Sequence, residues 1–320
     1  MCSMSKRLKA GVWSGVLLAT LVLFAAPTQA ALLEVCATCT YTDVESAVAA
    51  ATGEDTIILD GPAVYTLSAG LVIDSARDGL TIRGSSQVDP DTIEVSFATG
   101  PVITVDSDVE FNAEGFTISD GTTGVLVMTD ATVNISRCLI QDISGVGVDC
   151  VDVSRVTLKS TIIDGCTAEA TKIDIGGFLD IIQCTFVFNG SFGVNAVAGM
   201  ARVEASVIHD SDDGTSSLSG TNSTLEIDGN WMTAASSAPL LPPAGVVDAN
   251  PTLLPLDPLV DFEPAGFPGE FIAGRQQSTG LPATLITPSP SRDFTNLPRN
   301  RTDLTIGADE VVAFGGGLPG

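Results

Sequence analysis

The chain repeats one eight-residue phrase: VNISRCLI at 133–140, VTLKSTII at 156–163, LDIIQCTF at 179–186, ARVEASVI at 201–208 and, more loosely, LEIDGNWM at 225–232. Successive copies begin 23, 23, 22 and 24 residues apart. Each copy has apolar residues at its first and third positions, then a bend, then a second short apolar pair. A fixed step in the low twenties with this pattern is typical of stacked coils.

Stacking buries side chains that a single coil cannot bury. Each coil pairs in parallel with the next at a spacing of about 4.8 Å, so equivalent inward residues form ladders in one continuous core. The predicted inward ladder contains Ile135, Leu158, Ile181 and Val203. Small residues suit a corner between two strands, and they occupy the next repeat position: Cys138, Thr161, Cys184 and Ser206. We therefore predict an all-β parallel β-helix of about 23 residues per coil.

Residues 1–30 are typical of a cleaved secretory signal. Lys6, Arg7 and Lys9 precede an apolar run from Val12 to Ala26, which is followed by small residues. This run is shorter than the roughly 20 residues of a membrane-spanning helix. No later stretch is long and apolar enough to span a bilayer, so we expect an exported protein of the cell surface or the medium.

The predicted signal holds three of the 14 basic residues and none of the 39 acidic ones, which leaves the mature chain near −28. Such a charge repels phosphate backbones and makes nucleic acid a poor partner. Solubility outside the cell explains the charge, and calcium-rich or saline surroundings are a second explanation.

Residues 31–55 are predicted to form an N-terminal cap. Thr42 and Glu45 have the spacing of a capping box, and the apolar residues that follow at helical spacing are Val44, Ala47, Val48 and Ala51. The solenoid is predicted over 56–237, with early strands at 56–59, 71–73, 80–82, 102–105, 109–118 and 125–127.

Residues 238–320 differ in composition. Twelve of the 17 prolines fall between Pro239 and Pro298, which argues against regular ladder pairing. This segment is too apolar for a disordered linker, because it contains Leu253, Leu254, Leu256, Leu259, Phe262, Phe267, Phe271 and Ile272. We expect it to wrap along the side of the solenoid.

Two stretches resemble known families. YTDVESAVAAATGEDTIILDGPAVYTL at 41–67 and LVIDSARDGLTIRG at 71–84 resemble the opening of pectate-lyase-like right-handed parallel β-helices. SRDFTNLPRNRTDLTIGADE at 291–310 resembles the C-terminal signature of exported bacterial choice-of-anchor Q proteins, with matches at Asp293, Pro298, Arg299, Asp303, Ile306, Gly307, Ala308 and Glu310. The first resemblance implies a right-handed helix and not an activity. In the second family an anchoring element often follows the signature, whereas ten residues remain here.

A polar ridge is predicted just after the second apolar pair of successive coils. Its candidate ligand-binding residues are Asp142, Asp164, Asn189 and His209, and its candidate metal ligands are Asp210, Asp212 and Asp213. Asp and Asn also cap bends by bonding to nearby backbone, so these residues are equally explained as turn residues. Calcium, which prefers oxygen ligands, is the one cofactor that the ridge suggests.

Six cysteines follow the predicted signal. Cys36 and Cys39 are close enough to form a disulfide or half of a metal site. Cys138 and Cys184 lie two coils apart, near 10 Å, which exceeds the roughly 7 Å limit for a bridge. They are predicted to be buried thiols, and the sequence leaves Cys150 and Cys166 undecided.

The sequence favours a noncatalytic protein that binds polysaccharide or another cell-surface component. β-Helix hydrolases use paired carboxylates with histidine and basic residues nearby, whereas this chain has one histidine and no matching succession of motifs. A carbohydrate-active lyase or hydrolase with other catalytic residues is the first alternative, and a structural spacer is the second.

Overall fold

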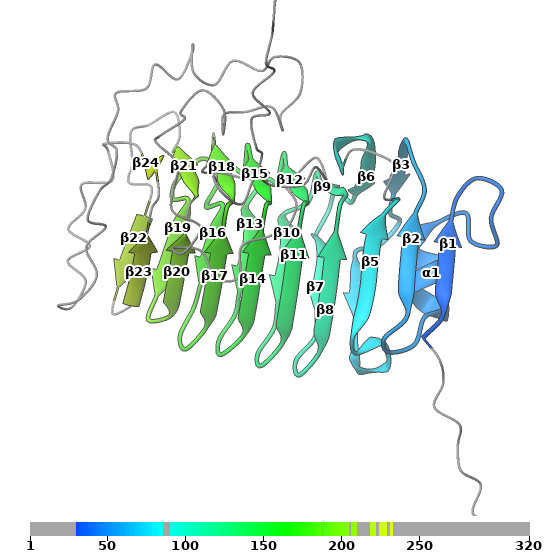
Figure 1. The fold of residues 1–320 in the computed structure, drawn as a ribbon, viewed down its shortest axis with the longest axis horizontal. Coiled ribbons are helices and arrows are strands. Elements are labelled where there is room, and N and C mark those ends of the chain that lie inside the picture. The colour runs from blue at the N-terminus through cyan, green and yellow to red at the C-terminus, as the bar shows by residue number, and fades with distance from the viewer. Residues whose placement is uncertain are drawn as a thin grey trace, which may run out of the picture.

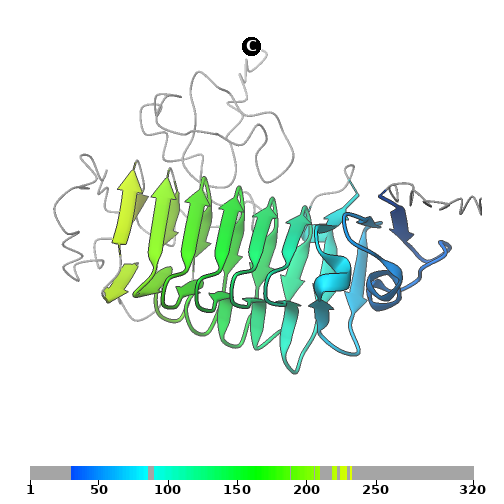
Figure 2. The same ribbon diagram turned by 90° about the horizontal axis from the view of Figure 1, so that it is seen from below.

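The computed structural model describes residues 30–85, 90–187, 189–204, 206–209, 218–221, 224–228 and 231–232. These residues form a β-solenoid of three parallel sheets whose strands stack along one axis (Figures 1 and 2). α1 (Val44–Ala50) is the one α-helix in this part of the chain, and η1 (Ser75–Arg77) and η2 (Pro90–Thr92) are single 3₁₀ turns. The predicted all-β parallel β-helix is therefore confirmed.

Each of the seven coils from β2 to β22 contributes one strand to each sheet, β1 precedes them, and β23 and β24 follow them. The nine-stranded sheet contains β1 (Leu32–Val35), β2 (Thr56–Leu59), β5 (Leu80–Gly84), β8 (Glu110–Glu114), β11 (Thr132–Ser136), β14 (Arg155–Lys159), β17 (Phe178–Ile182), β20 (Met200–Glu204) and β23 (Thr224–Asp228). The eight-stranded sheet contains β3 (Ala63–Thr66), β6 (Ile93–Ser96), β9 (Thr117–Ser119), β12 (Leu139–Gln141), β15 (Ile162–Asp164), β18 (Thr185–Val187), β21 (Val207–His209) and β24 (Trp231–Met232). The seven-stranded sheet contains β4 (Leu71–Ile73), β7 (Pro101–Val105), β10 (Thr123–Val127), β13 (Val146–Cys150), β16 (Thr171–Ile173), β19 (Val194–Val197) and β22 (Leu218–Thr221).

The predicted register is confirmed. Ile135 pairs with Leu158, Leu158 with Ile181 and Ile181 with Val203, and all four side chains are fully buried. The same ladder continues toward the N-terminus through Ala113, Ile82, Ile57 and Leu33. Because alternate residues of a strand face opposite sides, this ladder forms one wall of the continuous core.

Strands are present in the stretches predicted at 56–59, 71–73, 80–82, 102–105 and 125–127, whereas the stretch predicted at 109–118 is divided into β8 and β9, which lie in different sheets. The strands that were not predicted are β1, β3, β6, β13, β16, β19 and β22. β1 lies inside the predicted cap, yet it pairs in parallel with β2 and belongs to the solenoid. Leu33 and Val35 precede Ile57 and Leu59 by 24 residues, so the repeat step itself could have revealed this strand.

The N-terminal helix covers the end of the core, with Val44, Ala47 and Val48 buried. The predicted capping box is wrong in its details. Asp43 is the N-cap residue and accepts a hydrogen bond from Ser46 N at 2.7 Å. The Glu45 carboxylate instead accepts bonds from Ser68 N and Ser68 Oγ at 2.6 and 2.7 Å, which ties α1 to the segment between β3 and β4.

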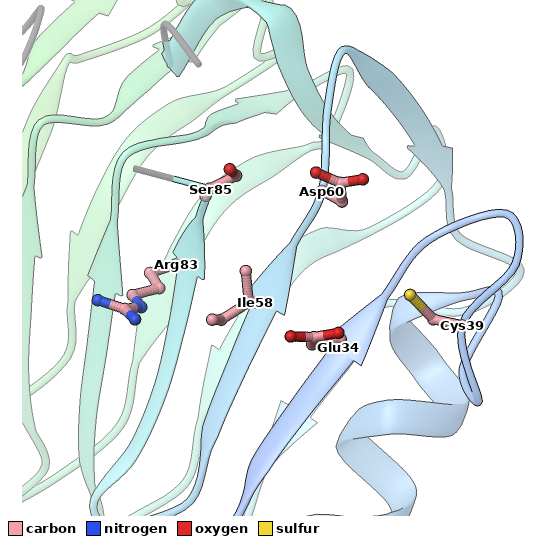
Figure 3. A pocket seen from close by; sticks show the side chains of 7 residues that line it. Glu34, Cys39, Ile58, Asp60, Arg83 and Ser85 are labelled. Atoms are coloured by element: carbon pink, nitrogen blue, oxygen red, sulfur yellow. The ribbon is translucent and has the colours of Figure 1, made fainter. Parts of the chain in front are cut away.

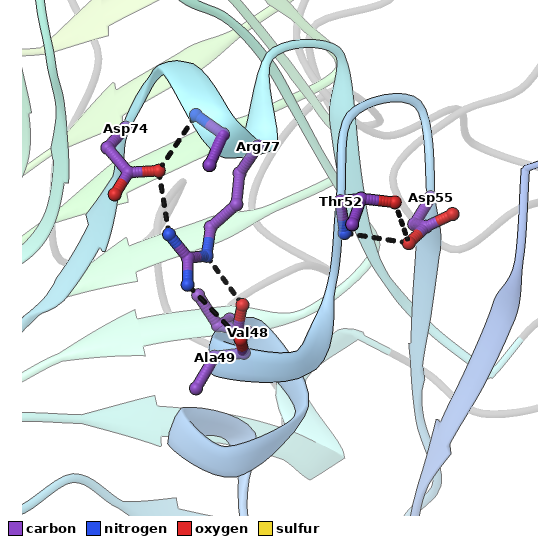
Figure 4. Close-up of polar contacts among 7 residues, drawn as sticks. Val48, Ala49, Thr52, Asp55, Asp74 and Arg77 are labelled. Atoms are coloured by element: carbon purple, nitrogen blue, oxygen red, sulfur yellow. Dashed lines mark hydrogen bonds and ion pairs between the residues drawn. The ribbon is translucent and has the colours of Figure 1, made fainter. Parts of the chain in front are cut away.

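Arg77 satisfies the other end of this helix (Figure 4). Its Nε donates to the Val48 carbonyl at 2.6 Å, and its Nη1 lies 2.7 Å from Asp74 Oδ1. The last carbonyls of a helix lack intrahelical partners, and a guanidinium group satisfies them well. Arg77 therefore joins α1 to the segment that follows β4.

The predicted corner column is buried throughout. Thr161 Oγ1 donates to the Lys159 carbonyl at 3.0 Å, and Ser206 Oγ accepts from Cys184 N at 3.0 Å. These hydroxyl groups therefore satisfy backbone atoms at the bend between the nine-stranded and eight-stranded sheets. The interpretation of this column as packing is confirmed.

The cysteines divide into two groups. Cys36 and Cys39 form a disulfide, so their predicted proximity is confirmed as a bridge. Cys138, Cys150, Cys166 and Cys184 are buried free thiols, which confirms the prediction for Cys138 and Cys184 and decides the other two. Burial raises the pKa of the Cys138 thiol to about 12, which keeps it protonated and unreactive at neutral pH.

Candidate functional site

The structure separates the residues of the predicted polar ridge. Asp164 is the last residue of β15 and aligns with Gln141 of β12 and Val187 of β18, while His209 aligns with Val187. Asp142 follows β12, and its backbone N–H donates to the Asp164 carbonyl at 3.2 Å. Asp142 and Asp164 therefore lie on neighbouring coils, as predicted.

Asp142 is exposed and has a φ of 54°. Aspartate tolerates this left-handed region better than most residues, which agrees with its interpretation as a turn residue. Asp164 is only partly exposed. Burial, together with the negative charge of Asp142, raises the pKa of the Asp164 carboxyl to about 6.

Asn189 does not belong to an outer ridge, and this prediction is wrong. Its side chain is fully buried, with Oδ1 accepting from Cys166 N at 3.1 Å and Nδ2 donating to the Ile163 carbonyl at 3.3 Å. Both halves of the amide satisfy backbone groups of the preceding coil. The 23-residue step aligns Asn189 with the buried Cys166, whereas Asp164 aligns with Val187, so the repeat itself could have separated Asn189 from the ridge.

The remaining ridge residues stay predictions. His209 ends β21, and the structure describes its backbone only. Asp210, Asp212 and Asp213 lie outside the described residues, as do the predicted signal and the C-terminal segment. Within the described residues, no group of three or more His, Cys, Asp or Glu side chains is arranged to hold a metal ion.

The nine-stranded sheet has a feature that the sequence analysis missed. Its outward residues align on consecutive coils to form what we call the central polar column: Asn112, Asn134, Thr157, Asp180 and Arg202. All five are partly exposed. The second letter of every repeat phrase carries the signal, because it is polar in each copy while its two neighbours are apolar.

Side-chain contacts run along this column. Asn134 Nδ2 donates to Asn112 Oδ1 at 3.0 Å, so the two amides form a ladder between coils. Beside the column, the Arg155 guanidinium lies over the Phe178 ring at 4.7 Å from its centroid. Arg155 and Phe178 are each two positions before a column residue, so they occupy the same outer face. The partly exposed ring thus lies beside the Arg155 guanidinium, on the same face as Asp180 and two positions before it.

A second charged group flanks the column. Arg137 Nη2 lies 2.9 Å from Glu114 Oε1, and Glu114 aligns with Arg83 of β5. A cavity of about 310 Å³ lies farther toward the N-terminus of the same face (Figure 3). Its polar lining consists of Glu34, Asp60, Arg83 and Ser85.

This face can form hydrogen bonds at a regular interval along the solenoid. The coils repeat about every 4.8 Å, so an elongated ligand lying along the axis would meet an equivalent polar group at each step. Amides and hydroxyls can both donate and accept, and an aromatic face can pack against an apolar ligand surface. The arrangement suits a polyhydroxylated polymer.

A family model and several solved structures are similar to this chain. The family described as right handed beta helix region matches residues 55–212. Solved pectin methylesterases are similar in structure: the enzyme of Aspergillus niger is 14% identical with a TM-score of 0.41, covering 67% of this chain and 88% of its own. The enzyme of Erwinia chrysanthemi is 13% identical with a TM-score of 0.32, covering 65% and 80%.

A third similar structure is a pectin methylesterase mutant in complex with a hexasaccharide, at 10% identity and a TM-score of 0.32, covering 65% of this chain and 80% of its own. No curated protein matches the sequence. The three stacked parallel sheets define a parallel β-solenoid, and the family match over residues 55–212 agrees with this architecture. In the described part of the chain, no helix is long and apolar enough to cross a membrane.

Proposed function

We propose that this chain is an exported, noncatalytic β-helix protein that binds carbohydrate along the central polar column. The observation that carries the proposal is the register of five partly exposed polar residues on consecutive coils, with the Phe178 ring beside them. Carbohydrate polymers repeat hydroxyl groups along their length and have apolar ring faces. A column of hydrogen-bonding groups flanked by an aromatic ring matches both properties.

A glycan array tests this function. The purified protein is applied with calcium and with a chelator, beside the variants Phe178→Ala and Asn134→Ala. We expect binding to a restricted set of glycans and a loss of at least tenfold in affinity for either variant. Ile175→Ala serves as the matched control, because Ile175 is an exposed apolar side chain outside the column. Binding that both column variants retain would contradict the proposed surface.

Calcium binding by the predicted polar ridge is tested separately, by thermal melting. Asp142 and Asp164 with Asp210, Asp212 and Asp213 form the candidate ridge, and neighbouring carboxylates favour a cation between them. If this ridge binds calcium, the ion raises the melting temperature, and Asp210→Asn with Asp212→Asn abolishes the rise. If calcium does not change the melting temperature, the ridge residues are ordinary turn residues. The proposed carbohydrate surface would be unaffected by this result.

Catalysis is the competing function, and product formation distinguishes it. A lyase would release unsaturated ends from a polysaccharide panel, and a hydrolase would release reducing ends. We expect neither, because the chain has one histidine, and neither its carboxylates nor its basic residues match the motifs of β-helix hydrolases or lyases. Product that disappears in an Asp180→Asn variant would overturn the noncatalytic assignment. A protein that gives neither binding nor product would be a spacer.

A further inference from the structure

The outer face of the eight-stranded sheet carries a buried, mainly apolar patch beside the polar residues Gln141 and Asp164. Leu139, Ile162 and Thr185 align on consecutive coils. The next residues along these strands, which are Ile140, Ile163 and Phe186, belong to the main core. Since successive side chains of a strand face opposite sides, the Leu139 column points away from that core.

These outward side chains are nevertheless buried. Leu139 and Ile162 are 1% exposed and Thr185 is 0% exposed, in contrast to the partly exposed central polar column of the neighbouring sheet. Leu139 and Ile162 form an apolar cluster of their own, separate from the main core. Val187, at the end of the same face, is also fully buried. We call these four residues the outer apolar face.

The course of the chain identifies what covers this face. The last described strand, β24, belongs to the eight-stranded sheet and pairs with β21, so the described part of the chain ends at this sheet. Residues 239–298 follow, with 12 of the 17 prolines and a series of Leu and Phe residues. Eight coils extend over roughly 34 Å, and about ten extended residues span that distance. The segment is long enough several times over.

We propose that residues 239–298 pack across the outer apolar face and that Leu139, Ile162 and Val187 are the positions on which they rest. Proline cannot donate to a strand ladder, so the segment is suited to covering a sheet by side-chain packing instead of extending it by backbone pairing. Its Leu and Phe residues supply the apolar groups that the face requires. A second copy of the chain and an unrelated partner are the competing occupants.

Photocrosslinking in the full chain tests the proposal. p-Benzoylphenylalanine is placed at Gln141, a partly exposed outward position beside Leu139, and in a separate protein at Thr157, on the nine-stranded sheet. We expect crosslinks within one chain from position 141 to peptides of 239–298, and none to those peptides from position 157. Crosslinks that join two chains, or that never reach 239–298 from position 141, would overturn the proposal.

Limited proteolysis gives a second readout that does not depend on the probe. Ile162→Asp should increase cleavage within 239–298 at least fivefold while peptides of the nine-stranded sheet stay protected. Thr157→Asp is the control and should leave cleavage at the parent rate. Unchanged cleavage of 239–298 in Ile162→Asp would contradict the proposed contact. If the whole chain loses protection, Ile162→Asp has unfolded the protein. The crosslinking result then decides the proposal.

Discussion

Asp164 and Asn189 were predicted to share one polar ridge, but their side chains have different surroundings. Both follow the second apolar pair of a coil, which was the basis of that prediction. Asn189 faces inward and bonds two backbone groups, whereas Asp164 remains partly exposed beside Asp142. Counted by the 23-residue step, Asn189 corresponds to Cys166 and lies two positions beyond the equivalent of Asp164, which is Val187. The sequence therefore predicted neighbouring positions but not a shared surface.

Asp164 should make stability depend on pH. Its pKa of about 6 lies above the usual value of 3.8, so the folded state binds more protons between roughly pH 4 and 6. The stabilisation of the protonated carboxyl is complete below that window and is lost as the pH rises through about 6. Asp164→Asn should remove this loss and raise the free energy of unfolding at pH 7.5 by about 2 kcal/mol, allowing for solvent screening.

Urea denaturation at pH 5 and pH 7.5 measures this effect. The difference in unfolding free energy between the two pH values should be smaller in Asp164→Asn than in the parent. Asp152→Asn is the control, because it makes the same chemical change at an exposed turn residue. Equal pH dependence of the parent and Asp164→Asn would refute the raised pKa.

The helix α1 shows which parts of an element a local pattern can predict. The apolar spacing correctly predicted the buried side of the helix, because that spacing follows directly from helix geometry. The cap was assigned to Thr42, one residue early, since Thr42 and Asp43 are both suitable N-cap residues. Glu45 fitted a capping box in sequence but bonds Ser68, 23 residues away. A contact at that separation cannot be read from the local motif.

The two candidate caps can be distinguished by mutation. Asp43→Ala removes the acceptor for Ser46 N and should lower the melting temperature by a few degrees. Thr42→Ala changes an exposed residue outside the helix and should leave the melting temperature within about one degree. Differential scanning calorimetry of both variants gives the comparison. If the melting temperature fell more in Thr42→Ala than in Asp43→Ala, Thr42 would be the N-cap residue, as the capping box predicted.

At the scale of the whole molecule, the repeat step predicted the register from β11 to β23. Equivalent residues must stack when coils pair in parallel, so a step of 22 to 24 residues determines which side chains share a ladder. The early coils vary more in length, and β3 and β6 were missed for that reason. Surface function was harder to predict, because outward residues tolerate many polar types, so the polar second position of each repeat phrase did not by itself indicate a site.

The core ladder makes a direct prediction of stability. Ile181→Asp places a charge among fully buried side chains and should lower the free energy of unfolding by at least about 3 kcal/mol. Ile175→Asp makes the same chemical change at a side chain that is 66% exposed and should change it by less than about 0.5 kcal/mol. Urea denaturation of the two variants compares them. Similar effects at both positions would place Ile181 outside the core.

Titration calorimetry with a glycan selected on the array tests the central claim most directly. The parent should bind with an affinity that falls at least tenfold when Phe178→Ala removes the ring beside the column, and the same should follow from Thr157→Val, which keeps the shape of the side chain but removes its hydroxyl group. Ile175→Ala should bind as the parent does. Parent-level affinity in both column variants, or no binding of any glycan by the correctly folded parent, would contradict a carbohydrate-binding role for this face of the solenoid.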